Sequence, residues 1–256
     1  MSSNILFVFE GRKAEPNIAR NLREQILNRD SKLIVQTSYG MSIYNLFNKV
    51  TEDEYFDTYE FIVQELESRD KLTDDDSAVI AIEDPDDISE IYLFFDYDCH
   101  CSNADDKKIR DMVGLFNDAQ DKGLLCISYP MVEAIRHQRG HAPEYLTHST
   151  VDLRNYKKWV NAAPDMDKQF QNWGLYTSET WSSIAKQHLS RVNYLLNDSL
   201  ELPTEPACMV EVFESQMNKH RPSSQVAVIS GFPLMLFDLY GDDTFNILDV
   251  AADEEI

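Results

Sequence analysis

Short apolar runs alternate with amphipathic segments over the first 140 residues of the chain. The apolar runs are brief and rich in β-branched or aromatic residues, which predicts strands, and they lie at 5–9, at 32–37, within 88–100 and at 123–130. The segments between them carry apolar residues at helical spacing, which predicts helices, at about 15–28, 41–71 and 104–121. This alternation is typical of an α/β fold with a parallel sheet flanked by helices.

The stretch 88–100 contains the clearest strand. Its run Ile91–Phe95 is apolar on both faces, as in a central strand of a parallel sheet. Two other stretches are less defined. The apolar run within the acidic stretch 74–84 predicts either a strand or a loop packed on the core, and 131–139 predicts the start of a helix after Pro130.

The pattern changes after about residue 140. We therefore divide the chain into an α/β domain, 1–140, and a mainly helical region, 141–256. Within the second part, 225–241 predicts a last strand followed by a short helix entered at Pro233. The acidic end, 249–256, is predicted to be frayed.

The charge of the chain limits its partners. Its 256 residues include 45 Asp and Glu against 23 Lys and Arg, a net charge of −22. Such a chain repels phosphates, so binding to duplex DNA by general electrostatics is disfavoured. A nucleic-acid role requires local basic patches, bound metal ions or a basic partner.

Other features predict a cytoplasmic location. There is no apolar run long enough to span a membrane, and the first residues resemble a strand more than a signal peptide. The four cysteines are predicted to be reduced thiols, because two of them are only one residue apart and no second ligand pair is spaced for zinc.

Three acids stand where the predicted strands end. Glu10 follows the first strand, and Asp96 and Asp98 close the stretch that contains the central strand. If these strands are neighbours, the carboxylates converge, because ligands of a parallel sheet bind beyond the carboxyl ends of its strands. A hard divalent ion, Mg²⁺ or Mn²⁺, would relieve their repulsion, and Glu10 could then serve as general acid or base. The alternative is that such acids only face solvent.

These residues also carry a resemblance. A strand ending in Phe9-Glu10-Gly11 and a later one ending in Asp96-Tyr97-Asp98 resemble the Toprim domain of topoisomerases, primases and OLD-type nucleases. With "FVFEGRKAEPNI", "FFDYDCH" and "ISYPMVEAI", the chain is similar to the RloB-like group of Toprim proteins, which includes the effector of the PARIS anti-phage system. The three motifs span residues 5–135.

The resemblance implies a Toprim-like, Rossmann-like sheet with an insertion at about 40–88. It implies that Glu10 is the Toprim glutamate, that Asp96 and Asp98 hold Mg²⁺, and that Glu133 is a further acid of the site. The proposed catalytic set is therefore Glu10, Asp96, Asp98 and Lys13, and the metal ligands come from Glu10, Asp96, Asp98 and Glu133.

The resemblance also implies an activity and partners. We expect a metal-dependent endonuclease that is a toxic effector of anti-phage defence, with RNA, and tRNA in particular, as its target. An ABC-type ATPase would sequester it until infection, and the active form could be a homodimer. The alternatives are a non-catalytic interaction protein on a Toprim scaffold and an OLD-like DNA nuclease.

Basic residues near these acids are the candidate substrate contacts. Arg12 and Lys13 follow Glu10 and could meet a scissile phosphate. Two further clusters, at 135–141 and 154–159, offer Arg136, Arg139 and Lys157, and the second also offers Tyr156 and Trp159 for stacking on RNA bases. The alternative for both clusters is an ordinary solvated helix face.

Overall fold

The computed structural model describes residues 4–27, 33–40, 42–50, 56–97, 99–100, 104–151 and 153–253. Its centre is a five-stranded sheet of order β2-β1-β3-β5-β4, in which β1, β2, β3 and β5 are parallel and β4 pairs antiparallel with β5. A second sheet pairs β6 with β7. The strands are β1 (Asn4–Phe9), β2 (Leu33–Ser38), β3 (Ile88–Asp96), β4 (Asn117–Asp118), β5 (Gly123–Ser128), β6 (Thr147–Ser149) and β7 (Gln225–Ala227).

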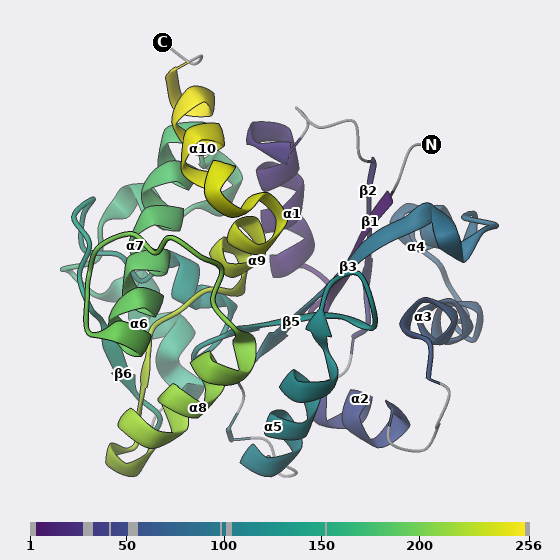
Figure 1. Ribbon diagram of the computed structural model, residues 1–256, viewed down its shortest axis with the longest axis horizontal. Coiled ribbons are helices and arrows are strands. Elements are labelled where there is room, and N and C mark those ends of the chain that lie inside the picture. The colour runs from purple at the N-terminus through teal and green to yellow at the C-terminus, as the bar shows by residue number, and fades with distance from the viewer. Residues whose placement is uncertain are drawn as a thin grey trace.

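Helices cover the central sheet on both sides. In Figure 1 the sheet runs through the middle of the molecule, with α1 and α9 on its left and α2, α3 and α4 on its right. The α-helices are α1 (Ala14–Gln25), α2 (Ile43–Val50), α3 (Thr58–Glu67), α4 (Asp74–Ile80), α5 (Asp106–Leu115), α6 (Tyr156–Ala162), α7 (Ser178–Asn197), α8 (Met209–Lys219), α9 (Gly231–Tyr240) and α10 (Thr244–Asp253). The predicted α/β class with a parallel sheet flanked by helices is therefore confirmed.

The predicted central strand is confirmed as β3, which lies between β1 and β5. Its residues from Glu90 to Phe95 are buried, as expected for a strand covered on both faces. On one face, the ring of Phe94 stacks on that of Phe232 in α9, with centroids 4.6 Å apart. Such a stacked pair contributes about 1 kcal/mol beyond its buried area.

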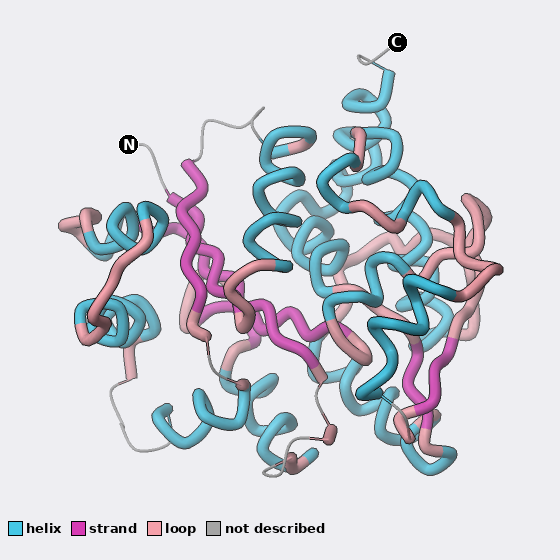
Figure 2. Tube along the Cα trace, turned by 180° about the vertical axis from the view of Figure 1, so that it is seen from behind, coloured by secondary structure: helices cyan, strands magenta, loops and turns pink. Residues whose placement is uncertain are grey.

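The helical second half of the chain packs on this sheet. Helix α9 contacts β3 and β5, and α7 and α10 pack around α9. Figure 2 shows these helices from behind, gathered on one side of the strands. The division at residue 140 stays a prediction, and the proposed insertion at 40–88 contains α2, α3 and α4.

Three local predictions were wrong. Most of the stretch 74–84 forms helix α4 (Asp74–Ile80), because Thr73 accepts from the Asp76 amide N–H while the Asp76 carboxylate accepts from the Thr73 amide N–H. This capping box starts a helix despite the β-branched residues that follow. The segment after Pro130 forms only a short 3-10 turn, η3 (Val132–Arg136). Of the predicted frayed end, 249–253 continue helix α10, and 254–256 lie outside the described residues.

No helix in the described part of the chain is long and apolar enough to cross a membrane.

Candidate active site at the carboxyl edge of the sheet

Glu10 and Asp96 lie side by side where β1 and β3 end. The Glu10 amide N–H donates to the Phe94 carbonyl over 2.9 Å, which extends the ladder between these strands by one residue. In return, the Asp96 amide N–H donates to Oε2 of Glu10 over 3.0 Å. The strands are neighbours, as convergence of the predicted acids requires, and the Glu10 side chain is fixed against the end of β3.

The turn that follows β5 adds a third carboxylate. The Val132 amide N–H in η3 donates to Oδ1 of Asp96 over 2.7 Å, which anchors the turn to the end of β3. The next residue, Glu133, is buried, and its carboxylate pairs with the Lys157 ammonium at 2.9 Å. Lys157, predicted to contact substrate, therefore reaches into the site from α6 and is paired with an acid.

A fourth carboxylate, Glu15, was not singled out from the sequence. It lies buried in the first turn of α1, and its Oε1 accepts from the Gly11 amide N–H over 3.1 Å. A Cβ atom at Gly11 would stand 2.5 Å from Oε2 of Glu15. The glycine after Glu10 therefore leaves room for this carboxylate.

The four acids repel one another. Burial, and then the negative charges of Glu10, Glu15 and Glu133, raise the pKa of Asp96 well above its ordinary value, although the Val132 N–H acts in the opposite direction. Burial is also the largest cause that raises the pKa of Glu15, and Glu133 adds to it. A cluster of this kind is typical of functional sites, where shifted pKa values accompany convergent charges.

The chemistry of the donors fits a hard divalent cation. All four offer carboxylate oxygens, which Mg²⁺ and Mn²⁺ prefer, and a cation would remove the repulsion that raises the pKa of Asp96. Asp98, a proposed metal ligand, lies outside the described residues. Among the residues that are described, no three or more His, Cys, Asp or Glu form a group that could hold a metal ion. A site with several carboxylate ligands therefore needs Asp98 or a closer approach of the acids.

Arg12 and Lys13 lie at this edge of the sheet, as their place in the sequence predicts. Both are exposed. A Cβ atom at Gly40 would stand 2.8 Å from Nε of Arg12, so the Arg12 side chain lies against the backbone that follows β2. Both side chains line a cavity beside the site, between α1, β2 and α4.

The other predicted substrate contacts are engaged within the protein. The Arg136 guanidinium lies over the ring of Trp173, 3.4 Å from its centroid, and donates to Asn161 over 2.8 Å. Arg139 pairs with Asp165 at 3.0 Å and with Glu144 at 3.4 Å. Arg139 is therefore already ion-paired, whereas the Arg136 guanidinium is held by two neutral side chains and also feels the charge of Glu133.

The two aromatic candidates differ. Tyr156 is fully buried, and its hydroxyl lies 2.9 Å from Nδ1 of His137, so it has no surface for a base. Trp159 is 37% exposed and remains accessible on one side. Trp159 can therefore stack on an RNA base, whereas Tyr156 cannot.

Fold and site together define an α/β protein with a carboxylate cluster at the carboxyl edge of a parallel sheet. Comparison of the chain with family models, with curated proteins and with solved structures gave no match. Function must therefore be argued from the site itself.

Proposed function

We propose that this protein is a metal-dependent endonuclease that cleaves RNA, with tRNA as the favoured target. The observation that supports it best is the convergence of Glu10, Glu15, Asp96 and Glu133 beside the exposed cations Arg12 and Lys13. Phosphodiester cleavage requires this combination, because the reacting phosphate needs positive charge and the attacking group needs a base.

The roles follow from position. Glu10 would act as general base or acid, since its carboxylate is fixed at the edge by the Asp96 amide. Arg12 and Lys13 would orient the phosphate. Glu10, Asp96, Asp98 and Glu133 would hold Mg²⁺ or Mn²⁺, and the ion, when bound, would stabilise the negative charge that develops on the phosphate.

The biological setting is proposed from the resemblance to the RloB-like group. The protein would be a toxic effector of anti-phage defence in the cytoplasm, restrained by an ABC-type ATPase and active as a homodimer once released. Its net charge of −22 suits docking on a basic partner surface.

A second candidate is a non-catalytic interaction protein. One observation favours it: within the described residues the acids bond to backbone N–H groups and to Lys157, and no three of them form a metal-binding group. An OLD-like DNA nuclease is less favoured because of the acidic charge.

An assay of the purified protein with different nucleic acids distinguishes these candidate functions. It is incubated with bulk tRNA, with plasmid DNA and with single-stranded DNA, in Mg²⁺, in Mn²⁺ and in a chelator. We expect tRNA fragments that require the divalent ion and intact DNA. Cleavage of DNA alone would show that the substrate is DNA and not RNA. Intact nucleic acids in every mixture would favour the interaction protein.

A further inference from the structure

A polar cavity of about 480 Å³ opens beside the carboxylate cluster. Its walls come from the start of α1, from the end of β2 and from the segment that joins α3 to α4. The cavity begins at Arg12 and Lys13, next to the site, and continues along β2 as far as Gln36 and Arg20. We call it the β2 groove. It lies at the outer edge of the sheet, where β2 is the outermost strand and α4 packs against it.

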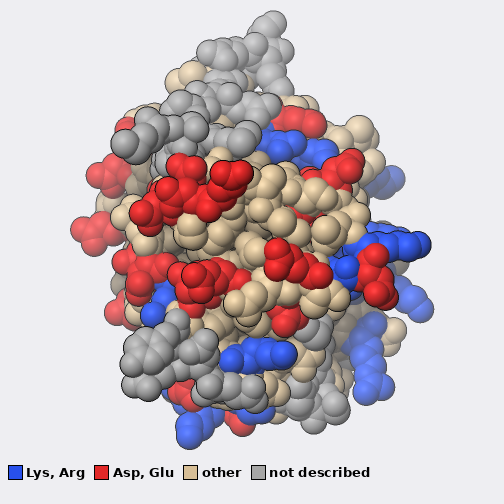
Figure 3. Space-filling view, turned by 90° about the vertical axis from the view of Figure 1, so that its right-hand side faces the viewer, with Lys and Arg blue, Asp and Glu red and all other residues tan. Residues whose placement is uncertain are grey.

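The β2 groove concentrates positive charge in an acidic protein. Five basic side chains line it, against three acids, and the basic set is Arg12, Lys13, Arg20, Arg69 and Lys71. Figure 3 shows the contrast on the side of α2 to α4, where acidic side chains spread over the face and basic ones gather mainly toward its right-hand edge. The groove therefore attracts anions locally, although the chain as a whole repels them.

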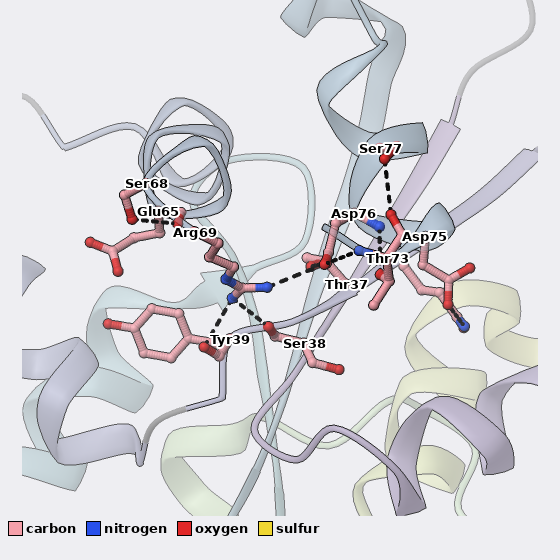
Figure 4. A network of polar contacts seen from close by, with 11 residues as sticks. Thr37, Ser38, Tyr39, Glu65, Ser68, Arg69, Thr73, Asp75, Asp76 and Ser77 are labelled. Carbon is pink, nitrogen blue, oxygen red and sulfur yellow. Dashed lines mark hydrogen bonds and ion pairs between the residues drawn. The ribbon is translucent and has the colours of Figure 1, made fainter. Parts of the chain in front are cut away.

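The acids of the groove are largely engaged already. Asp76 is buried, accepts from the Thr37 hydroxyl over 2.6 Å and pairs with Arg69 at 3.3 Å. Arg69 also donates to the carbonyls of Ser38 and Tyr39, and Figure 4 shows it pointing from the end of α3 toward both. This network fixes the groove wall, because it joins α3, α4 and the end of β2.

The cations nearer to solvent are differently placed. Arg12, Lys13 and Lys71 are exposed and form no ion pair with any residue that the structure describes. Arg20 is also exposed and stands 4.0 Å from Asp75, an exposed pair that contributes little. A row of accessible cations thus leads away from the carboxylate cluster.

We infer that the β2 groove binds the phosphate backbone of a single-stranded RNA segment next to the scissile phosphate. The inference rests on the proposed nuclease function, which it extends by assigning a path to the substrate strand. The groove volume is in the range of small-ligand cavities, about 300–1,000 Å³, which admits one or two nucleotides but no duplex. Gln36 is buried and donates to Oδ2 of Asp75 over 2.9 Å, so the wall side chains that offer hydrogen-bond partners for a base are the exposed Asn17 and the second carboxylate oxygen of Asp75.

Binding of a short fluorescein-labelled single-stranded RNA, followed by fluorescence anisotropy, tests this inference. The groove variant is Arg20→Ala/Lys71→Ala, which leaves the carboxylates and the Arg69 network in place. The matched control is Lys107→Ala/Lys168→Ala, which removes two exposed lysines elsewhere. All binding is measured in the Glu10→Gln background, so that cleavage does not interfere.

We expect the groove variant to bind the RNA about tenfold more weakly at about 0.1 M salt and the salt slope to fall by about 1.4, because two phosphate contacts are lost. The control should stay within about twofold, since its lysines lie outside the strand path. Equal weakening in both variants, or none in either, would overturn the inference.

Cleavage by the same variants with an intact Glu10 separates this inference from the proposed function. RNA cleavage that does not depend on the groove would support the proposed nuclease function and contradict RNA binding in the β2 groove. Groove-dependent binding without any cleavage would reject the nuclease and keep the groove as an RNA-binding site. Absence of both binding and cleavage would reject both.

Discussion

Two polar clusters adjoin the η3 turn, and they differ in how their charges are balanced. On one side, Glu10, Glu15, Asp96 and Glu133 repel one another. On the other, the fully buried Arg191 donates to the carbonyl of Glu144 over 2.8 Å and to Oε1 of Gln138 over 2.6 Å. The first cluster is held together against its own repulsion, whereas in the second the charged guanidinium is satisfied by hydrogen bonds to uncharged oxygens.

The second cluster extends to the buried His188. Nδ1 of His188 accepts from the Ser230 amide N–H over 3.2 Å, and its other nitrogen lies 2.7 Å from the Gln138 side-chain amide. Gln138 lies two residues after η3 and its side-chain amide donates to the carbonyl of Ile135 in the turn, so this cluster holds the turn that carries Glu133. Repulsion thus marks the edge that we propose as the active site, and the satisfied network supports the turn beside it. Substitutions should then separate activity from stability.

The largest effect is expected on activity, from Glu10→Gln. Cleavage should fall by about a thousandfold or more, because the general base is lost while the amide still fits its position. The melting temperature should change by less than that of a typical core variant. The exposed Glu24→Gln on α1 is the matched control. Full activity in a folded Glu10→Gln protein would show that this edge of the sheet takes no part in cleavage.

The next largest effect is expected on stability, from Arg191→Ala. Loss of the guanidinium leaves several buried oxygens unpaired and a cavity, which should lower the free energy of unfolding by about 4 kcal/mol. Denaturant unfolding measures it, with the exposed Arg154→Ala as control. A loss below about 1 kcal/mol would show that the network does not support the fold.

A smaller effect is expected from pH. Burial, and then the charge of Arg191, lowers the pKa of His188 well below its ordinary value and that of His137 to about 3. Both are therefore neutral in the folded protein, and only the unfolded chain takes up protons as pH falls below about 6.5. Their contribution to stability is complete above that pH and is lost below it.

At pH 5 this proton uptake should cost about 2 kcal/mol for each histidine. Thermal unfolding from pH 7.5 to pH 5 in the wild type and in His188→Gln measures the difference, because other titrating groups are common to both. The variant should lose less stability on acidification. Identical profiles would mean that His188 does not titrate on unfolding.

The smallest effect is expected at the proposed active edge, from Asp96→Asn. It should raise the free energy of unfolding by about 1 kcal/mol, because it removes a repelled charge while an amide oxygen can still accept from Val132. The exposed Asp121→Asn should leave stability unchanged. A loss of stability in Asp96→Asn would show that the charge is already balanced.

The sequence predicted the acids at the ends of β1 and β3 better than it predicted the other charged residues around them. Glu10 and Asp96 were recognisable because each ends a continuous apolar run, and neighbouring parallel strands bring such ends together. Glu15 was not recognised, since an acid in a first helical turn usually only stabilises the helix. The sequence feature that indicates Glu15 is its closeness to Glu10, because a short turn after β1 keeps the start of the next helix at the same edge of the sheet.

The basic residues show why a cluster of positive charge in the sequence is a poor predictor of a substrate-binding surface. Arg136 and Arg139 stand close together in the sequence, but their partners Trp173 and Asp165 come from segments that only folding brings near. The β2 groove has the opposite character, because Arg12, Arg20 and Lys71 are scattered in the sequence and assembled by α1, β2 and α4. Helix α4 itself was missed because its start depends on a capping pair at Thr73.

The most direct test of the central claim is to sequence RNA and DNA ends from cells that express the wild type or Glu10→Gln without a partner. If the carboxylate edge cleaves RNA, new ends appear at a few defined positions in structured RNA loops, and only with the wild type. The same new RNA ends in both cultures, or growth arrest by the wild type with no new ends in either nucleic acid, would contradict it.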